Sequence, residues 1–264
     1  MRLIEVYFRI QYANFKARLA YPTNFFVGIF GISLIGLLNI ALLWILTNSV
    51  PLIKGWNFYE LLFLVSIWRI ADGIFILLFE QIRQLDNLIR EGVFDRYLVR
   101  PFNSLFLFST HKFEVAGLGD IISGGIALLI AVNHIGEWNA GKILLLIMVI
   151  LTGAIIEWSI YTIISCSAFW TIQAEGLRSL INPFLYNFTQ YPLSIYSNPI
   201  KIIMTFIIPI GFMSFYPSHL FFEKSSVPFN ENLIYLSPII AIVLALLSIS
   251  LWSKGINAYK GAGS

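Results

Sequence analysis

Long apolar stretches alternate with short polar connections along the whole chain. Six of them reach or approach the ~20 residues that an α-helix needs to cross about 30 Å of hydrocarbon. They are 24–47, 58–80, 113–133, 143–170, 199–215 and 233–252. These stretches lack the alternation of period two that membrane barrels show, so helices must satisfy the backbone in lipid. The pattern predicts an all-α polytopic membrane protein, with residues 1–264 forming a single transmembrane domain of six helices.

Positive charge divides unevenly between the two sides of this predicted topology. With the N-terminus inside, the inner segments carry thirteen lysines and arginines, namely Arg2, Arg9, Lys16, Arg18, Arg83, Arg90, Arg96, Arg100, Lys112, Arg178, Lys201, Lys254 and Lys260. The outer connections carry only Lys54, Lys142 and Lys224. Because lysine and arginine are retained on the cytoplasmic side of membrane proteins, we expect both termini to be cytoplasmic.

Residues 3–19 have an amphipathic pattern of their own before the first apolar stretch. At helical spacing, charged residues form a narrow stripe, made of Arg2, Glu5, Arg9 and Lys16. Apolar residues form a wide neighbouring arc, centred on Ile4, Phe8, Tyr12, Phe15 and Leu19. Such a helix suits the headgroup plane of a membrane, and Tyr21-Pro22 would end it. We predict an interfacial helix within 1–22; alternatively, the segment is only the charged flank of the first span.

Composition agrees with a membrane protein and excludes several functions. The chain is 58% hydrophobic and 12% charged, whereas soluble domains carry about 25% charged residues. The net charge of +3 follows from topology, so no nucleic-acid partner is expected. The sequence has no G-x-x-x-x-G-K-[ST] loop and no protease or esterase motif, so we expect no ATP site, catalytic residue or cofactor in this chain. His111, His134 and His219 lie in separate regions, which argues against a metal site, and Cys166 is expected to serve packing.

The most informative segment is the charged block EQIRQLDNLIREGVFDRYLVRP, residues 80–101. Its first half continues the second span as an amphipathic helix that Gly92 is placed to end, and Pro101 closes a second short segment. A basic cytoplasmic loop explains the arginines but not this helix or the run Phe94-Asp95-Arg96-Tyr97. We therefore interpret the block as a docking surface for a soluble partner. Its candidate residues are Arg83, Asp86, Arg90, Glu91, Gly92, Phe94, Asp95, Arg96 and Arg100.

Four ionisable residues lie deep within the apolar stretches, away from their ends: Arg69, Asp72, Asp120 and Glu157. A lone charge at the centre of a span costs roughly 2.5–3.5 kcal/mol on insertion scales. Pairing of Arg69 with Glu157 across the second and fourth spans would remove most of this cost, and so would pairing with Asp72 on the same helix. The residues predict either a structural salt bridge or a site that faces a substrate or carries protons.

One string resembles an enzyme motif. Gly117-Leu118-Gly119-Asp120 matches the G-x-G-D of intramembrane aspartyl proteases, which need a second aspartate at the same depth. Asp72 is the only membrane-embedded candidate for that role. The alternative is that Gly117 and Gly119 allow two helices to pack closely while Asp120 faces a polar groove.

Prolines surround the fifth apolar stretch. Pro209 and Pro217, together with Phe212 and Phe215, predict a broken helix near the outer face followed by a re-entrant or interfacial hairpin. Non-helical backbone at membrane depth needs a cover of protein or a water-filled cavity. We expect this hairpin to act as an outer gate.

Taken together, these residues resemble the permease subunits of ABC-2 type ATP-binding-cassette transporters, within a bacterial branch of six-span permeases. The resemblance rests on EGVFDRYLVRP at residues 91–101, on Tyr191-Pro192, on Ile208-Pro209 followed by Tyr216-Pro217, and on the tail from Trp252 through Gly255 and Tyr259 to Ser264. It implies an N-terminal interfacial helix, a coupling helix between the second and third spans, and a re-entrant hairpin before the sixth.

The resemblance also implies partners and a mechanism. Members of this family combine two permease halves with two ATPase subunits, which bind the ATP and Mg²⁺. The second half would be a homologous permease or a second copy, and transport would be export across the cytoplasmic membrane of a bacterium. The alternative function is a stand-alone secondary transporter or channel that uses Arg69, Asp72, Asp120 and Glu157; the intramembrane protease is a remote third.

Overall fold

The computed structural model describes residues 2–171, 174–222 and 227–259. Within these ranges all regular secondary structure is helical, and turns, loops and an isolated β-bridge between Ile53 and Trp56 make up the rest. The longer helices are α1 (Arg2–Leu19), α2 (Pro22–Ser49), α3 (Phe58–Phe79), α7 (Ala116–Val132), α8 (Ala140–Cys166), α10 (Glu175–Thr189) and α13 (Ser237–Ala258). The all-helical prediction is confirmed.

Four helical segments are long and apolar enough to cross a membrane: Pro22–Ser49, Phe58–Arg90, Ala140–Thr171 and Ser237–Ala258. A bent pair of helices adds a fifth candidate, and α7 is apolar but has only 17 residues. Length and composition thus support four or five spans in the described part of the chain, against the six that were predicted.

The fifth predicted span, 199–215, is not one straight helix. Asn198–Ile207 and Ile210–Ser218 meet at an angle of 74°. The first half comprises α11 (Asn198–Ile202) and the π-helical turn η3 (Ile203–Ile207); the second comprises η4 (Ile210–Phe212) and α12 (Phe215–Ser218). The bend lies at Ile208-Pro209, since proline removes a backbone donor and keeps the preceding residue out of the helical conformation.

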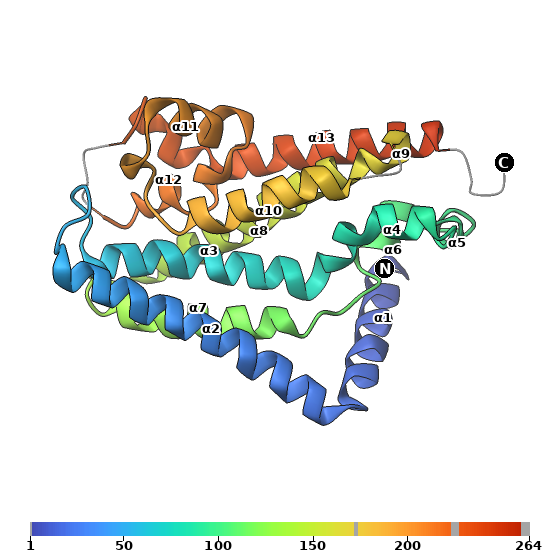
Figure 1. Ribbon diagram of the computed structural model, residues 1–264, viewed down its shortest axis with the longest axis horizontal. Helices are drawn as coiled ribbons and strands as arrows, with labels where there is room; N and C mark the ends of the chain where they lie inside the picture. Colours follow the sequence, from blue (N-terminus) through green and yellow to red (C-terminus); the bar gives the residue numbers. More distant parts are fainter. Residues whose placement is uncertain (1, 172–173, 223–226, 260–264) are drawn as a thin grey trace.

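Helix α10 lies in residues 171–198, where the hydropathy pattern predicted only a connection. Its polar residues Glu175, Arg178, Asn182 and Asn187 dilute the apolar signal, although Leu185 and Thr189 are buried. In Figure 1, α2, α3, α7, α8, α10 and α13 run along the long axis of the molecule, and each runs opposite to the one before it.

The two ends of this bundle differ in the elements they carry. One end, here named the α4 end, holds α4 (Leu85–Arg90), α5 (Asp95–Leu98) and α6 (Ser104–Ser109); α11 and α12 lie at the opposite end, the α12 end (Figure 1). Lys201 therefore lies away from the arginine-rich block, which corrects its predicted place on the same side. Lys224 and Lys260 fall outside the described residues.

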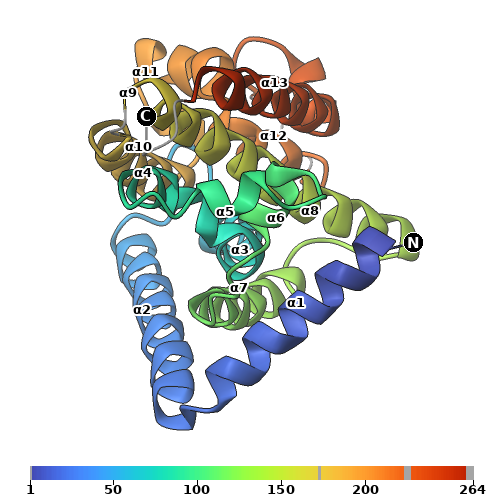
Figure 2. The same cartoon turned by 90° about the vertical axis from the view of Figure 1, so that its right-hand side faces the viewer.

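Helix α1 crosses the α4 end at a steep angle to α2 (Figure 2). The Gln11 side-chain amide donates to the Thr110 carbonyl over 2.7 Å, and the Asn14 amide donates to the His111 carbonyl over 2.6 Å. On its outward side, Phe8 and Tyr12 are 65% and 69% exposed. The helix thus pairs a polar seam against the bundle with exposed apolar rings, as an interfacial helix would.

Helix α3 is the centre of the bundle, and glycines let its neighbours approach it. A Cβ atom on Gly73 of α3 would lie 2.8 Å from the Gly117 carbonyl oxygen of α7. The same close approach joins α7 and α2, since a Cβ atom on Gly119 of α7 would lie 2.8 Å from the Ile29 carbonyl oxygen of α2. Both distances are shorter than a carbon–oxygen contact allows, so the packing interpretation of Gly117 and Gly119 is confirmed. Cys166 is buried within the core, as expected.

Candidate functional site: an exposed charged surface and a buried polar cavity

The charged block begins where the α-helix α3 changes to a 3-10 turn. The 3-10 turn η1 (Glu80–Gln84) continues α3 into α4, and Gly92 ends α4 with a φ of 69°. In this left-handed conformation, which glycine adopts without strain, the Val93 amide donates to the Leu88 carbonyl over 2.9 Å. Gly92 therefore ends the helix as the sequence predicted.

Four of the predicted docking residues form a solvent-exposed charged surface on α4 and α5. Arg90, Glu91, Arg96 and Arg100 are all exposed, and together with Asn87 we name them the α4–α5 surface. Arg90 donates to the Asn87 side-chain oxygen, which orients its guanidinium along the helix. These four charged groups are therefore exposed to solvent at the α4 end.

Phe94 does not belong to that surface. It is fully buried among Phe108, Phe169, Trp252 and Tyr259, with ring centroids 5.4–5.8 Å apart. Asp95 is half-buried, and its Oδ1 accepts a hydrogen bond of 2.9 Å from the Tyr259 hydroxyl. The C-terminal end of α13 thus anchors the charged block from within, and the prediction of a docking role for Phe94 is corrected to that of a core residue.

Asp86 is also buried rather than exposed. Its side chain is 0% exposed and accepts two hydrogen bonds from Arg178 of α10, Nη1 to Oδ1 over 2.9 Å and Nη2 to Oδ2 over 3.0 Å. The Arg178 guanidinium also donates to the Arg83 carbonyl. This bidentate pair joins the start of α10 to α4. This pair could not be predicted from the sequence, because the two residues are 92 positions apart.

The Arg83 side chain turns from the charged block into the bundle. Its guanidinium lies 4.0 Å from the Tyr161 ring centroid and 4.8 Å from that of Phe75. Nη1 lies 3.1 Å from Glu80 Oε2, and Nη2 lies 3.8 Å from Glu157 Oε1. Nη2 is also 4.0 Å from Asp72 Oδ1. Arg83 is therefore part of the buried polar network, which corrects its predicted place on the docking surface.

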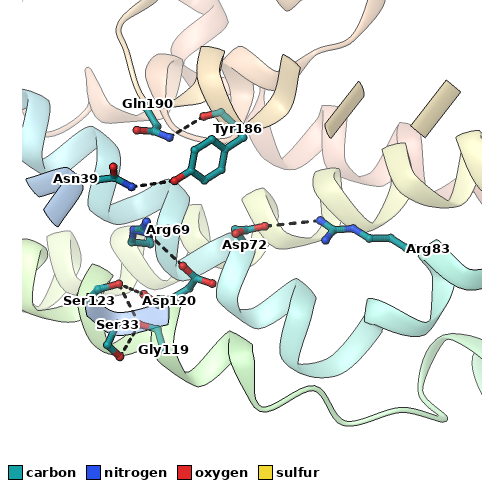
Figure 3. Close-up of polar contacts among 10 residues, drawn as sticks. All are labelled: Ser33, Asn39, Arg69, Asp72, Arg83, Gly119, Asp120, Ser123, Tyr186 and Gln190. Carbon is teal, nitrogen blue, oxygen red and sulfur yellow. Dashed lines mark hydrogen bonds and ion pairs between the residues drawn. The ribbon is translucent and has the colours of Figure 1, made fainter. Parts of the chain in front are cut away.

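Arg69 pairs with neither of its predicted partners. Its Nη1 donates to Asp120 Oδ1 over 3.2 Å, because the close packing of α3 on α7 brings the two side chains together. Figure 3 shows this pair next to Asn39 of α2 and Tyr186 of α10, whose side chains are hydrogen-bonded to each other over 2.8 Å. Glu157, the partner expected for Arg69, lies against Arg83 instead.

All four predicted intramembrane residues line one cavity of about 510 Å³ between α2, α3, α7, α8 and α10. Asp72 and Asp120 each face a different arginine, so they do not form the paired dyad that an aspartyl protease needs. A second cavity of about 830 Å³ lies between α1, α2 and residues 111–116, and Ile32 and Ile35 line both cavities.

The residues of the predicted outer hairpin are packed inside the α12 end. Pro209, Phe212, Phe215 and Pro217 are all buried. The Phe215 ring lies 5.7 Å from that of Trp56, which belongs to the loop between α2 and α3. The broken helix is thus covered by protein.

The fold and these contacts define a class: a multi-pass helical membrane protein with a charged cavity inside and a charged surface at one end. The family described as ABC-2 family transporter protein matches residues 33–263, so the chain belongs to the ABC-2 transporter permeases. Membership implies partnership with ABC ATPase subunits. Comparison with curated proteins found no match, and neither did comparison with solved structures.

Proposed function

We propose that the chain is the permease subunit of an ABC-2 exporter in the cytoplasmic membrane of a bacterium, driven by a separate ATPase. Both termini would be cytoplasmic, and α2, α3, α7, α8, α10 and α13 would cross the membrane in turn. The alternating direction of these helices and the arginine-rich α4 end support this topology. At 1.5 Å per residue, α10 covers about 22 Å, so residues 190–197 would complete its crossing.

The proposal depends most on the α4–α5 surface. Arg90, Glu91, Arg96 and Arg100 are exposed on a segment that continues α3 directly. Exposed charges of both signs suit a polar, reversible contact with a soluble subunit, since such groups steer association and fix register. Two ATPase subunits would dock on two permease halves, the second half being a homologous permease or another copy, and would supply the ATP and Mg²⁺.

The buried contacts beneath that surface give the docked ATPase a mechanical connection to the bundle. Phe94 packs against α13, and Asp86 pairs with Arg178 at the start of α10. A displacement of α4 and α5 would therefore move α10 and α13 with it. Because α10 lines the charged cavity, ATP-driven closure of the ATPases would change the shape of that cavity, and the hairpin around Pro209 and Pro217 would gate its exit at the α12 end.

Charge reversal tests the docking role. The complex with Arg90→Glu and Arg96→Glu is reconstituted, and assembly and ATPase activity are measured beside a matched Lys142→Glu variant. Lys142 begins α8 at the α12 end, so its reversal alters charge without reaching the docking surface. The expected result is loss of assembly or of stimulated ATPase in the double variant alone. Intact assembly and ATPase in that variant would disprove the assignment.

The stand-alone transporter remains the competing function, and the shared cavity of Arg69, Asp72, Asp120 and Glu157 is the observation that favours it. Family membership favours the ATP-driven permease. Dependence of transport on an ATPase subunit and on ATP distinguishes the two.

A further inference from the structure

The polar network in the cavity holds more carboxylates than arginines. Among the described residues that line it, Arg69 and Arg83 face the three carboxylates Asp72, Asp120 and Glu157. Arg69 and Asp120 form a one-to-one pair. Arg83 faces the other two, Asp72 and Glu157, which approach the same nitrogen atom. Its other terminal nitrogen is paired with Glu80, outside the lining of the cavity.

Glu157 is the least satisfied of these groups. Its side chain is 2% exposed, and its shortest approach to a cation is 3.8 Å, beyond hydrogen-bond length. Oε2 has no hydrogen-bond donor among the described residues, and the side chain lies against the Asp72 carboxyl, which is a second acceptor group. A buried carboxylate without donors is costly, so the site calls for a further positive charge or a donor.

The walls of the cavity suit a cation that is otherwise hydrophobic. Trp68, Tyr161 and Tyr186 supply aromatic rings, and Ile35 and Ile76 supply apolar surface. Aromatic faces attract cations, and Arg83 already lies over the Tyr161 ring. The volume of about 510 Å³ falls within the range of roughly 300–1,000 Å³ that holds drug-sized ligands.

We propose that this cavity binds a hydrophobic monocation, with the positive charge beside Glu157 and the apolar body against the rings of α3, α8 and α10. The neighbouring cavity beside α1, which shares Ile32 and Ile35, would be its route from the α4 end. The inference rests on the proposed function and names the class of substrate that the exporter carries.

The test uses two probes of the same shape and opposite charge, tetraphenylphosphonium and tetraphenylborate. The complex is isolated with the full-length chain as the captured subunit. Equilibrium binding of each probe to this complex is then measured without nucleotide. Tetraphenylphosphonium should bind saturably, and tetraphenylborate should fail to compete with it. Glu157→Gln removes the charge and should weaken binding at least about tenfold, as expected for a lost charged hydrogen bond or ion pair. Glu137→Gln, at an exposed carboxylate between α7 and α8 that lines neither cavity, should change it less than about twofold.

Absence of saturable binding would overturn the proposal, and so would equal binding of the anion. Binding that survives Glu157→Gln unchanged would overturn the role of Glu157. The comparison of the two probes uses the unaltered protein and so holds even if a variant fails to fold. Because the measurement needs no ATP, these failures leave ATPase coupling untouched, whereas failure of the charge-reversal experiment at Arg90 and Arg96 would disprove the docking role of the α4–α5 surface and leave the binding result unchanged.

Discussion

The buried pair of Asp86 and Arg178 offers the sharpest test of how the charged block is held. Asp86 is 0% exposed and the Arg178 side chain 12%, and two hydrogen bonds of 2.9 Å and 3.0 Å join them. Removal of one partner strands the other charge, which typically costs about 3–5 kcal/mol. Replacement of both by apolar residues of similar volume is often close to neutral, because it removes both desolvation penalties.

The experiment is a double-mutant cycle with Asp86→Leu, Arg178→Met and the combined variant. Unfolding of the purified protein in mixed micelles, followed by tryptophan fluorescence, gives the free energies. Each single variant should lose about 3–5 kcal/mol and the double variant less than either. Arg178 also donates to the Arg83 carbonyl, so Arg178→Met should be the more damaging single change.

A matched pair on the surface serves as the control. Arg9 and Glu5 are 2.6 Å apart but largely exposed, so Arg9→Met should leave stability unchanged within error. Strictly additive losses in the cycle would mean that the two side chains do not interact, and the proposed connection between α4 and α10 would be wrong.

Three further predictions concern substitutions at single positions. Gly117→Val should destabilise the α3–α7 contact by about 1–3 kcal/mol and lower the melting temperature, whereas Gly28→Val, with no atom within 4 Å of its Cβ, should not; equal effects would contradict the packing. Phe94→Ala should cost about 3–5 kcal/mol in unfolding experiments, and Val99→Ala, at an 83% exposed residue, almost nothing. Burial and then the charges of nearby Arg100 and Arg96 lower the pKa of His111 from 6.5, so the stability of the protein should fall as pH drops below that value. The variant His111→Gln should show a smaller fall in stability between about pH 7.5 and 5.5. An unchanged slope in this variant would contradict the role of His111.

The apolar helices were predictable because their signal is local. Windows of about 20 apolar residues identified α2, α3, α8 and α13 closely, and α7 with them. The end of α4 at Gly92 was equally predictable, because glycine adopts without strain the left-handed conformation that ends a helix. Helix α10 was missed because a helix that lines a polar cavity carries polar residues, and these lower its hydropathy below that of a lipid-facing span.

Side-chain partners at long range were not predictable. Arg69 was expected to meet Glu157, but the glycines that draw α7 onto α3 bring Asp120 closer. Exposure of the charged block was misjudged where distant segments cover it, at Asp86 by Arg178 and at Phe94 by α13. Hydropathy reports whether a segment is apolar and gives no information on which segment 90 or more positions away lies on top of it.

We infer that this permease works only together with an ATP-hydrolysing subunit, and isolation of the intact assembly would show whether it does. The full-length chain is purified from membranes of the cell that makes it, and the co-eluting proteins are identified and assayed for ATPase activity. We expect a stoichiometric companion that carries a G-x-x-x-x-G-K-[ST] loop and is released by charge reversal at Arg90 and Arg96. A homogeneous chain that moves solute across liposomes without any ATPase would contradict it.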